Sequence, residues 1–234
     1  MKTFLDLQEG LQDPNIFKAF FLAGGPGSGK SFVVRKATGG TGLRVVNSDD
    51  IFEKYLKDAN LEMDMRTKQA EREAEIRDKL RKRAKDVTAK RQANYVEGRI
   101  GLIIDGTGKD YDKIAKQSNQ LKRLGYDTYM IFVNTSLDVA LERNAKRARS
   151  VPESMAVKSW KAVQNNLGKF SNHFRSGMII VDNNDIKTDD GTLFNDILRQ
   201  VRSLLKRKVT NPTAKQWVMN QMKERGITKA PKGF

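Results

Sequence analysis

Short apolar runs alternate with longer amphipathic segments along the chain. Short runs that are apolar on both faces are typical of parallel strands covered by helices on both sides. The pattern predicts strands at residues 17–23, 43–47, 100–104, 128–133 and 178–181. Helices are predicted from the glycine-rich stretch after the first strand to residue 37, within 51–99, from Ser136 to the break at Val151-Pro152, and over 111–124, 153–167 and 192–207. This alternation predicts a doubly wound α/β fold with a five-stranded, mainly parallel sheet.

The 234 residues are expected to form a single domain. Its core is predicted over about 16–208, with a helical insertion over about 55–99, an arginine-rich lid over about 140–152 and a C-terminal extension over 209–234. The insertion is highly charged and has few apolar positions, so part of it is expected to project from the core. Its stretch at 81–85 contains no acidic residue, and the chain ends in a basic tail.

A glycine-rich stretch follows the first predicted strand and precedes the first predicted helix. It reads Gly24-Gly25-Pro26-Gly27-Ser28-Gly29-Lys30-Ser31 and fits the pattern G-x-x-x-x-G-K-[ST]. Such a turn directs backbone N–H groups and a helix N-terminus at one spot, which suits the phosphates of a nucleoside triphosphate. We therefore expect bound ATP, with the Lys30 ammonium at the β- and γ-phosphates and the Ser31 hydroxyl on Mg²⁺. The predicted nucleotide-binding residues are Gly25, Gly27, Ser28, Gly29, Lys30, Ser31 and Phe32.

Carboxylates follow two of the other predicted strands. Asp49 and Asp50 come after the second strand, and Asp105 closes the third. Since the carboxyl ends of parallel strands meet at one edge of the sheet, these groups should lie near the phosphate site. Asp105 is expected to hold Mg²⁺ together with Ser31, although an aspartate here can also serve only a turn. Asp49 is predicted to act as general base for an acceptor hydroxyl.

The second aspartate of the pair has a different expected role. Asp50 is predicted to cap the next helix and to lie, with Thr107, on the substrate side of the site.

Three arginines follow the fourth predicted strand. Arg143 and Arg147 are four residues apart and, on a continuous helix, would share one face. Their guanidinium groups are expected to close over the triphosphate and to neutralise charge in the transition state. Arg149, and from the insertion Arg81 and Arg83, are expected to bind the substrate. The alternative for these cations is a general nucleic-acid patch.

Composition narrows the possible partners. The formal net charge is +16, which favours a polyanionic partner such as nucleic acid, although a merely solvated surface is also compatible with it. The chain has no cysteine and one histidine, which excludes disulfides and argues against zinc sites and a Ser-His-Asp triad. No apolar run approaches the ~20 residues of a membrane helix, and the N-terminus lacks the plan of a signal peptide. A cytoplasmic protein is expected, with no membrane partner and no evident obligate protein partner.

Taken together, these motifs resemble the kinase domain of phage-type 5′-hydroxyl polynucleotide kinases and the wider group of P-loop kinases that includes zeta toxins. The resemblance covers about residues 17–185 and adds Asn47-Ser48-Asp49-Asp50 and Arg143-Asn144-Ala145-Lys146-Arg147 to the glycine-rich motif. It implies a P-loop kinase fold with Lys30 and Ser31 in the P-loop, Asp49 as general base, and Arg143 and Arg147 as lid arginines. Phe52 departs from the pattern, because the phage enzymes place an acceptor-binding arginine there.

The resulting interpretation is a kinase that transfers the γ-phosphoryl group of ATP to a hydroxyl of a nucleic acid, with DNA favoured over RNA. The acceptor hydroxyl would belong to a 5′ end or to a hydroxymethylated base. One alternative is a zeta-toxin-like kinase that phosphorylates a small nucleotide sugar. A second alternative is an ATP-dependent nucleic-acid-binding module, which would have no need of Asp49 as a base.

Overall fold

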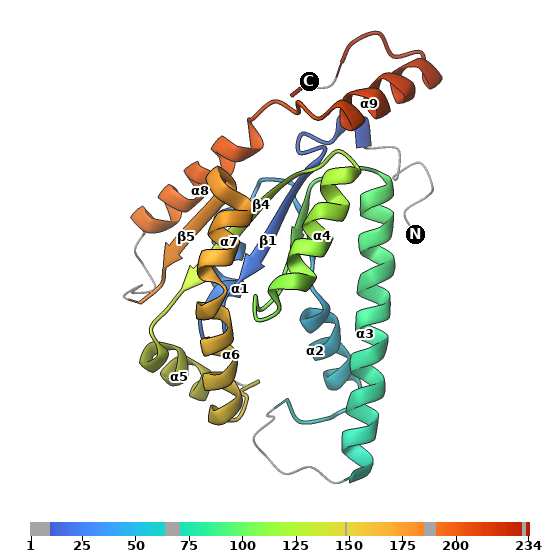
Figure 1. Ribbon diagram of the computed structural model, residues 1–234. Coiled ribbons are helices and arrows are strands. Elements are labelled where there is room, and N and C mark those ends of the chain that lie inside the picture. Colours follow the sequence, from blue (N-terminus) through green and yellow to red (C-terminus); the bar gives the residue numbers. More distant parts are fainter. Residues whose placement is uncertain (1–9, 64–70, 148, 185–190, 231–232) are drawn as a thin grey trace.

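A computed structural model describes residues 10–63, 71–147, 149–184, 191–230 and 233–234. Its centre is a five-stranded sheet in the order β2-β3-β1-β4-β5 (Figure 1), in which every adjacent pair is parallel. The predicted α/β fold is therefore confirmed, with an all-parallel rather than mainly parallel sheet among the described strands. The strands are β1 (Lys18–Ala23), β2 (Arg44–Val46), β3 (Leu102–Ile104), β4 (Asp127–Asn134) and β5 (Met178–Asp182).

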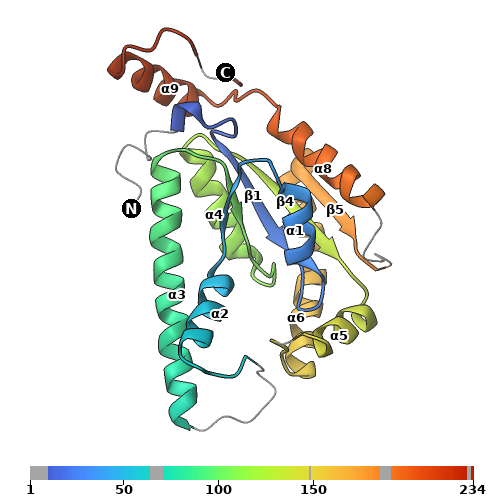
Figure 2. The same ribbon diagram turned by 180° about the vertical axis from the view of Figure 1, so that it is seen from behind.

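Helices cover both faces of the sheet. They are α1 (Lys30–Thr38), α2 (Ser48–Asp58), α3 (Glu71–Glu97), α4 (Tyr111–Arg123), α5 (Leu137–Ala145), α6 (Glu153–Asn165), α7 (Leu167–Phe174), α8 (Gly191–Leu205) and α9 (Pro212–Glu224), with a 3-10 turn η2 (Arg175–Gly177) before β5. Helices α4 and α7 lie on one face, and α1 and α8 lie on the other (Figures 1 and 2). Successive side chains of β1 point to opposite faces of the sheet. Phe21 packs in the hydrophobic core beneath α4 and α7, and Phe20 packs in the core beneath α1 and α8.

The charged insertion consists of α2 and α3, which lie side by side (Figure 1). A small separate core joins them, formed by Phe52 and Leu56 from α2 and Ala84 from α3. Both helices agree with the helical structure that the sequence predicts within residues 51–99. Helix α2 begins at Ser48, earlier than expected, because the Asn47 side chain caps it and so places both aspartates of the motif inside the first turn.

One predicted helix boundary is wrong, and one helix was not predicted. Helix α5 ends at Ala145 rather than continuing to the break at Val151-Pro152. The reason is the buried Asn144 amide, which donates to the Val151 carbonyl at 2.8 Å and accepts from the Val151 N–H at 3.2 Å, so the chain turns back. Helix α7 was not expected; the Asn166 side chain ties its start to the carbonyls of Gly108 and Lys109.

The C-terminal extension is attached to the core. Helix α9 begins at the cap Asn211, and its Trp217 ring meets the Phe17 ring edge-on with centroids 5.5 Å apart. Lys18, at the start of β1, is buried and pairs with Asp127 at 2.7 Å. None of the described helices combines the length and the apolar composition that crossing a membrane requires.

Candidate active site

The glycine-rich loop joins β1 to α1 in the predicted strand–turn–helix arrangement. Gly29 occupies the N-cap of α1 with φ of 78°, and no side chain caps the helix, so its first N–H groups remain available to a ligand. Gly27 has φ of 76°, and a Cβ there would lie 1.9 Å from the Ala140 carbonyl oxygen. Glycine is required at both positions because of the backbone conformation and, at Gly27, because of a close backbone approach.

The loop opens into a cavity of about 710 Å³ at the carboxyl edge of the sheet. This volume lies in the range of small-molecule and cofactor sites. The cavity collects nearly every residue that the sequence singled out, from five separate parts of the chain. Its lining includes Gly25, Gly27, Ser28, Gly29, Lys30, Ser31, Phe32, Asp49, Asp50, Arg81, Asp105, Thr107, Arg143, Arg147 and Arg149. Arg83 is the predicted site residue that does not line it.

Arg83 and Arg81 are separated because residues two apart on a helix do not share a face. The Arg81 guanidinium carbon lies 4.5 Å from the centre of the Phe52 ring and faces the cavity. The Arg83 guanidinium carbon lies 5.2 Å from the centre of the Tyr55 ring, and its side chain is exposed. The expectation that both arginines reach the substrate is therefore not supported for Arg83.

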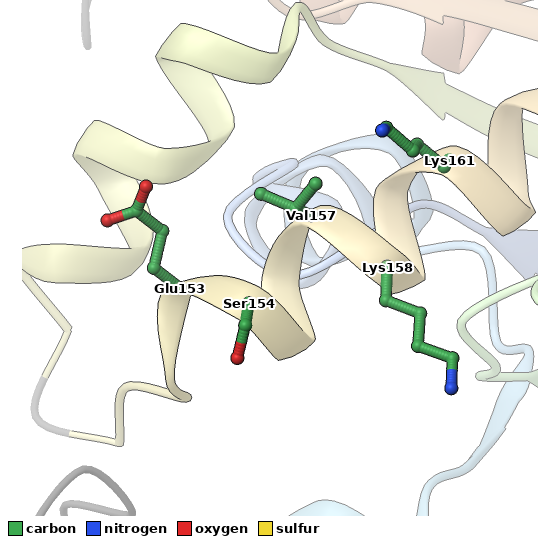
Figure 3. Close-up of a pocket in the computed structure, with 5 residues that line it drawn as sticks. All are labelled: Glu153, Ser154, Val157, Lys158 and Lys161. Carbon is green, nitrogen blue, oxygen red and sulfur yellow. The ribbon is translucent and has the colours of Figure 1, made fainter.

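A second hollow lies on the outer side of α6 (Figure 3). Its lining comes from this one helix and contains no predicted catalytic residue; the residues are Glu153, Ser154, Val157, Lys158 and Lys161. Met155 and Ser159 of the same helix line the large cavity instead. Helix α6 therefore forms a wall of the active-site cavity, and the outer hollow takes no part in it.

Lys30 and Asp105 form an ion pair at 2.9 Å beside the phosphate loop. Both side chains are largely buried, at 15% and 12% exposure. Ser28 Oγ is a buried atom that makes no hydrogen bond in the described part of the chain. A buried hydroxyl oxygen normally has a partner, so it points to a ligand in this part of the cavity.

Mg²⁺ fits the oxygens found here. The described residues contain no cluster of three or more acidic, histidine or cysteine side chains around one position. Mg²⁺ in a nucleotide site does not need such a cluster, since one or two protein oxygens suffice beside phosphates and waters. Ser31 and Asp105, which both line the cavity, are the residues that would supply those oxygens.

The first turn of α2 carries the candidate base. Asn47 Oδ1, in the side chain, accepts from the Asp49 N–H at 2.8 Å, and Asn47 Nδ2 donates to Asp50 Oδ1 at 2.9 Å. Asn47 is therefore the cap, and the expectation that Asp50 caps this helix is wrong. Burial raises the pKa of Asp50, and the negative charges of Asp105, Glu53 and Asp49 raise it further.

Arg149 contacts the candidate base directly. Its Nη2 lies 3.0 Å from Asp49 Oδ1, and its Nη1 lies 3.0 Å from Glu53 Oε1. The Arg149 side chain is 14% exposed, whereas Asp49 is 53% exposed. Sequence reasoning missed Glu53, although its position four residues after Asp49 places both on one face of α2. In this structure Arg149 therefore pairs with Asp49 and Glu53, and its guanidinium is not left free for a substrate.

Arg143 and Arg147 do not share a helix face as expected. Arg143 lies in α5, and its guanidinium donates to the carbonyls of Asn183 at 2.6 Å and Asn184 at 3.3 Å. Arg147 lies beyond the end of α5, in the loop that leads to α6. The buried Asn183 amide also donates to the Ser28 carbonyl of the phosphate loop. Arg143 therefore connects α5 to the loop after β5, next to the phosphate loop.

Comparison with known proteins identifies a matching family and solved structures with the same fold. A family model described as an AAA domain (AAA_33) matches residues 20–169. No curated protein sequence matches the chain. A protein of Chloroflexus aurantiacus provisionally assigned as a kinase is 17% identical, with a TM-score of 0.54, over 80% of this chain and 97% of its own.

Two further solved structures share the fold. The AvrRxo1-ORF1:-ORF2 complex with ATP is 12% identical, with a TM-score of 0.55, over 82% of this chain and 69% of that chain. The Pnkp1/Rnl/Hen1 RNA repair complex is 19% identical, with a TM-score of 0.50, over 67% of this chain and 47% of that chain. At these identities the likeness shows the fold alone.

Proposed function

The chain belongs to the AAA_33 family, described as an AAA domain, and on that premise we propose that it transfers the γ-phosphoryl group of ATP to a hydroxyl of a nucleic acid. Family and fold support the coarser statement, an ATP-dependent phosphotransferase that acts on a hydroxyl group. One observation carries the proposal: the phosphate loop and the Asp49 carboxylate line the same cavity. A donor phosphate and an acceptor hydroxyl can thus meet there.

The donor half of the site consists of the phosphate loop and its neighbours. Backbone N–H groups at the start of α1 bind the phosphates, and the Lys30 ammonium exchanges its contact with Asp105 for the β- and γ-phosphate oxygens. Ser31 and Asp105 would hold Mg²⁺, which supplies positive charge against the phosphate oxygens when it is bound. Arg147, in the loop between α5 and α6, also lines the cavity and adds positive charge there.

The acceptor half provides the base. The acceptor oxygen attacks the γ-phosphorus, the bond from that phosphorus to the β–γ bridging oxygen breaks, and ADP leaves. The proton of the acceptor hydroxyl passes to the Asp49 carboxylate. The Arg149 guanidinium contacts Asp49 Oδ1, so it fixes the carboxylate while the second oxygen accepts the proton.

The choice of a nucleic acid as acceptor rests on charge. A net charge of +16 attracts polyanions and serves no evident purpose for a small acceptor. Arg81, from the insertion, brings part of that charge into the cavity itself. DNA that carries a 5′-hydroxyl end or a hydroxymethylated base is the preferred acceptor class.

A nucleotide sugar is the second candidate acceptor. The observation that favours it is that the carboxylates of Asp49, Asp50 and Glu53 line the cavity, because carboxylates accept hydrogen bonds from sugar hydroxyls. An ATP-dependent binding module remains the third reading, and it predicts no phosphoryl transfer to any acceptor.

The test is transfer of labelled γ-phosphate from ATP with Mg²⁺ to a panel of acceptors. The panel contains 5′-hydroxyl DNA and RNA, hydroxymethylated DNA with blocked ends, and nucleotide sugars. Label on a nucleic acid, lost in Lys30→Ala and in Asp49→Asn with ATP still bound by the latter, is the expected result. Label on the sugars alone would refute the nucleic-acid acceptor, and an unchanged rate in Asp49→Asn would refute the base.

A further inference from the structure

The face of α3 that lies against α2 carries two arginines one helical turn apart, Arg77 and Arg81. Residues four apart lie on the same side of a helix, separated by roughly 6 Å along its axis. Leu80 and Ala84 occupy the same side and pack in the small core between the two helices. Figures 1 and 2 both show α2 lying beside α3. Both arginines therefore belong to the seam between these helices rather than to the solvated side of α3.

Arg77 is buried without a counter-ion. It is 7% exposed, and its Nε and Nη2 atoms are buried and make no hydrogen bond. No ion pair with Arg77 is found within the described ranges of the chain. A buried guanidinium without a partner is strongly unfavourable, so this arrangement points to an anion that is supplied from outside the chain.

Arg81 lies where the contact between α2 and α3 reaches the active-site cavity. It lines the cavity, packs on the Phe52 ring and, in the described part of the chain, has no carboxylate partner. The Arg149 guanidinium carbon also lies 5.7 Å from the centre of this ring, but two carboxylates already neutralise Arg149. Of these two guanidinium groups beside Phe52, Arg81 is the one available to an anion.

We propose that Arg81 and Arg77 form a subsite for a phosphate group of the acceptor. The inference rests on the proposed function, since it assigns the acceptor's own phosphate to the seam between α2 and α3. Arg81 contacts the phosphate from the cavity wall, and Arg77, one turn behind it, adds positive charge that no carboxylate of the described chain cancels. The acceptor is thus a molecule that carries a phosphate beside the hydroxyl to be phosphorylated, such as a nucleic-acid strand.

The test measures binding to the full-length protein by fluorescence anisotropy across a range of salt concentrations. The probes are a 3′-labelled single-stranded 12-nucleotide DNA with a 5′-hydroxyl and, in a competition arm, a uridine diphosphate sugar. Arg81→Gln should weaken DNA binding about tenfold or more and lower the salt slope by about 0.7, the value for one lost contact on a single strand. Arg123→Gln, an exposed change at the end of α4 with the same loss of charge, is the matched control.

Arg77→Met gives a second readout that does not depend on activity. Without ligand its Tm should exceed that of the wild type, because an unpaired buried charge is replaced by an apolar chain of similar length. With the DNA probe its Tm should rise less than that of the wild type. A lower Tm without ligand, or an unchanged response to DNA, would contradict the role of Arg77.

The outcomes separate this inference from the function on which it rests. If Arg81→Gln binds both the DNA and the uridine diphosphate sugar as tightly as the wild type, or Arg123→Gln loses as much affinity, the subsite is refuted even where phosphoryl transfer occurs. If both seam variants lose affinity but no nucleic acid is phosphorylated, the subsite stands and the proposed function fails. Loss confined to the uridine diphosphate sugar supports the subsite and assigns its phosphate to a small nucleotide.

Discussion

Replacing Arg149 by glutamine is expected to slow phosphoryl transfer mainly through kcat. Arg149 makes two contacts of 3.0 Å, to Asp49 and to Glu53. Because Asp49 is 53% exposed and Glu53 is 34% exposed, each pair should add only about 0.2–1 kcal/mol to stability. The expected loss of about 1 kcal/mol in total lowers Tm by about 2–4 °C for a domain of this size. The protein should therefore remain folded, and the kinetic effect can be measured.

The fall in kcat caused by Arg149→Gln should not exceed the fall caused by removing the Asp49 carboxylate. A general base contributes about 10²–10⁴-fold to the rate, which sets the loss expected for Asp49→Asn. Arg149→Gln leaves the carboxylate present but free to rotate, so kcat should fall about 10–100-fold, or about 1.4–2.7 kcal/mol. Arg149→Lys keeps the charge but not the two-pronged geometry and should lie between the wild type and Arg149→Gln.

Two measurements decide whether Arg149 acts through Asp49. The first compares kcat and KM for both substrates, and the KM for ATP should remain close to that of the wild type. The second is a double-mutant cycle, in which Asp49→Asn with Arg149→Gln should be no slower than Asp49→Asn alone. Additive losses would refute the reasoning, because they would mean that Arg149 contacts a substrate independently of the base.

Three further predictions follow from single contacts. Gly29→Ala should abolish nucleotide binding measured by calorimetry, because Gly29 has φ of 78° and a Cβ there would lie 2.2 Å from the Asn183 side-chain amide. Gly168→Ala is the control and should bind normally, because a Cβ at Gly168 has no neighbour within 4 Å. Asp50→Asn should raise Tm at pH 7, because burial raises the pKa of Asp50 and its ionised form is unfavourable when folded. That gain should vanish below the ordinary value of 3.8, where the carboxyl is protonated in both states. Lys18→Met should lower unfolding free energy in urea by about 2–4 kcal/mol, because Asp127 loses its partner; an unchanged midpoint would contradict this.

The local parts of the site were predictable from the sequence. The phosphate loop is encoded by glycines whose backbone freedom is needed wherever a strand turns into a helix around phosphates, so it was identified without tertiary information. The edge shared by Asp49 and Asp105 followed from the alternation of strands and helices, because parallel strands present their carboxyl ends together. Two further features could have been predicted from helical spacing alone. Residues four apart share a helix face, as Asp49 and Glu53 do, and residues two apart do not, which separates Arg83 from Arg81.

Other features depend on contacts between distant segments. Arg147 and Arg149 leave the helix because the buried Asn144 binds the Val151 backbone, and no local propensity indicates that turn. Asn183 reaches the phosphate loop, and Arg149 reaches Asp49, across about 155 and 100 residues of chain respectively.

The sequence by itself determined the fold class, the phosphate loop and the carboxylates beside it, because these depend on local backbone geometry and on periodicity. Only the tertiary structure decided which cations are neutralised and which are left for a ligand. Arg149 is paired with Asp49 and Glu53, whereas Arg77 is buried without a counter-ion among the described residues. Charge pairing depends on distances between elements that are remote in sequence, and composition records the number of charges but not their neighbours.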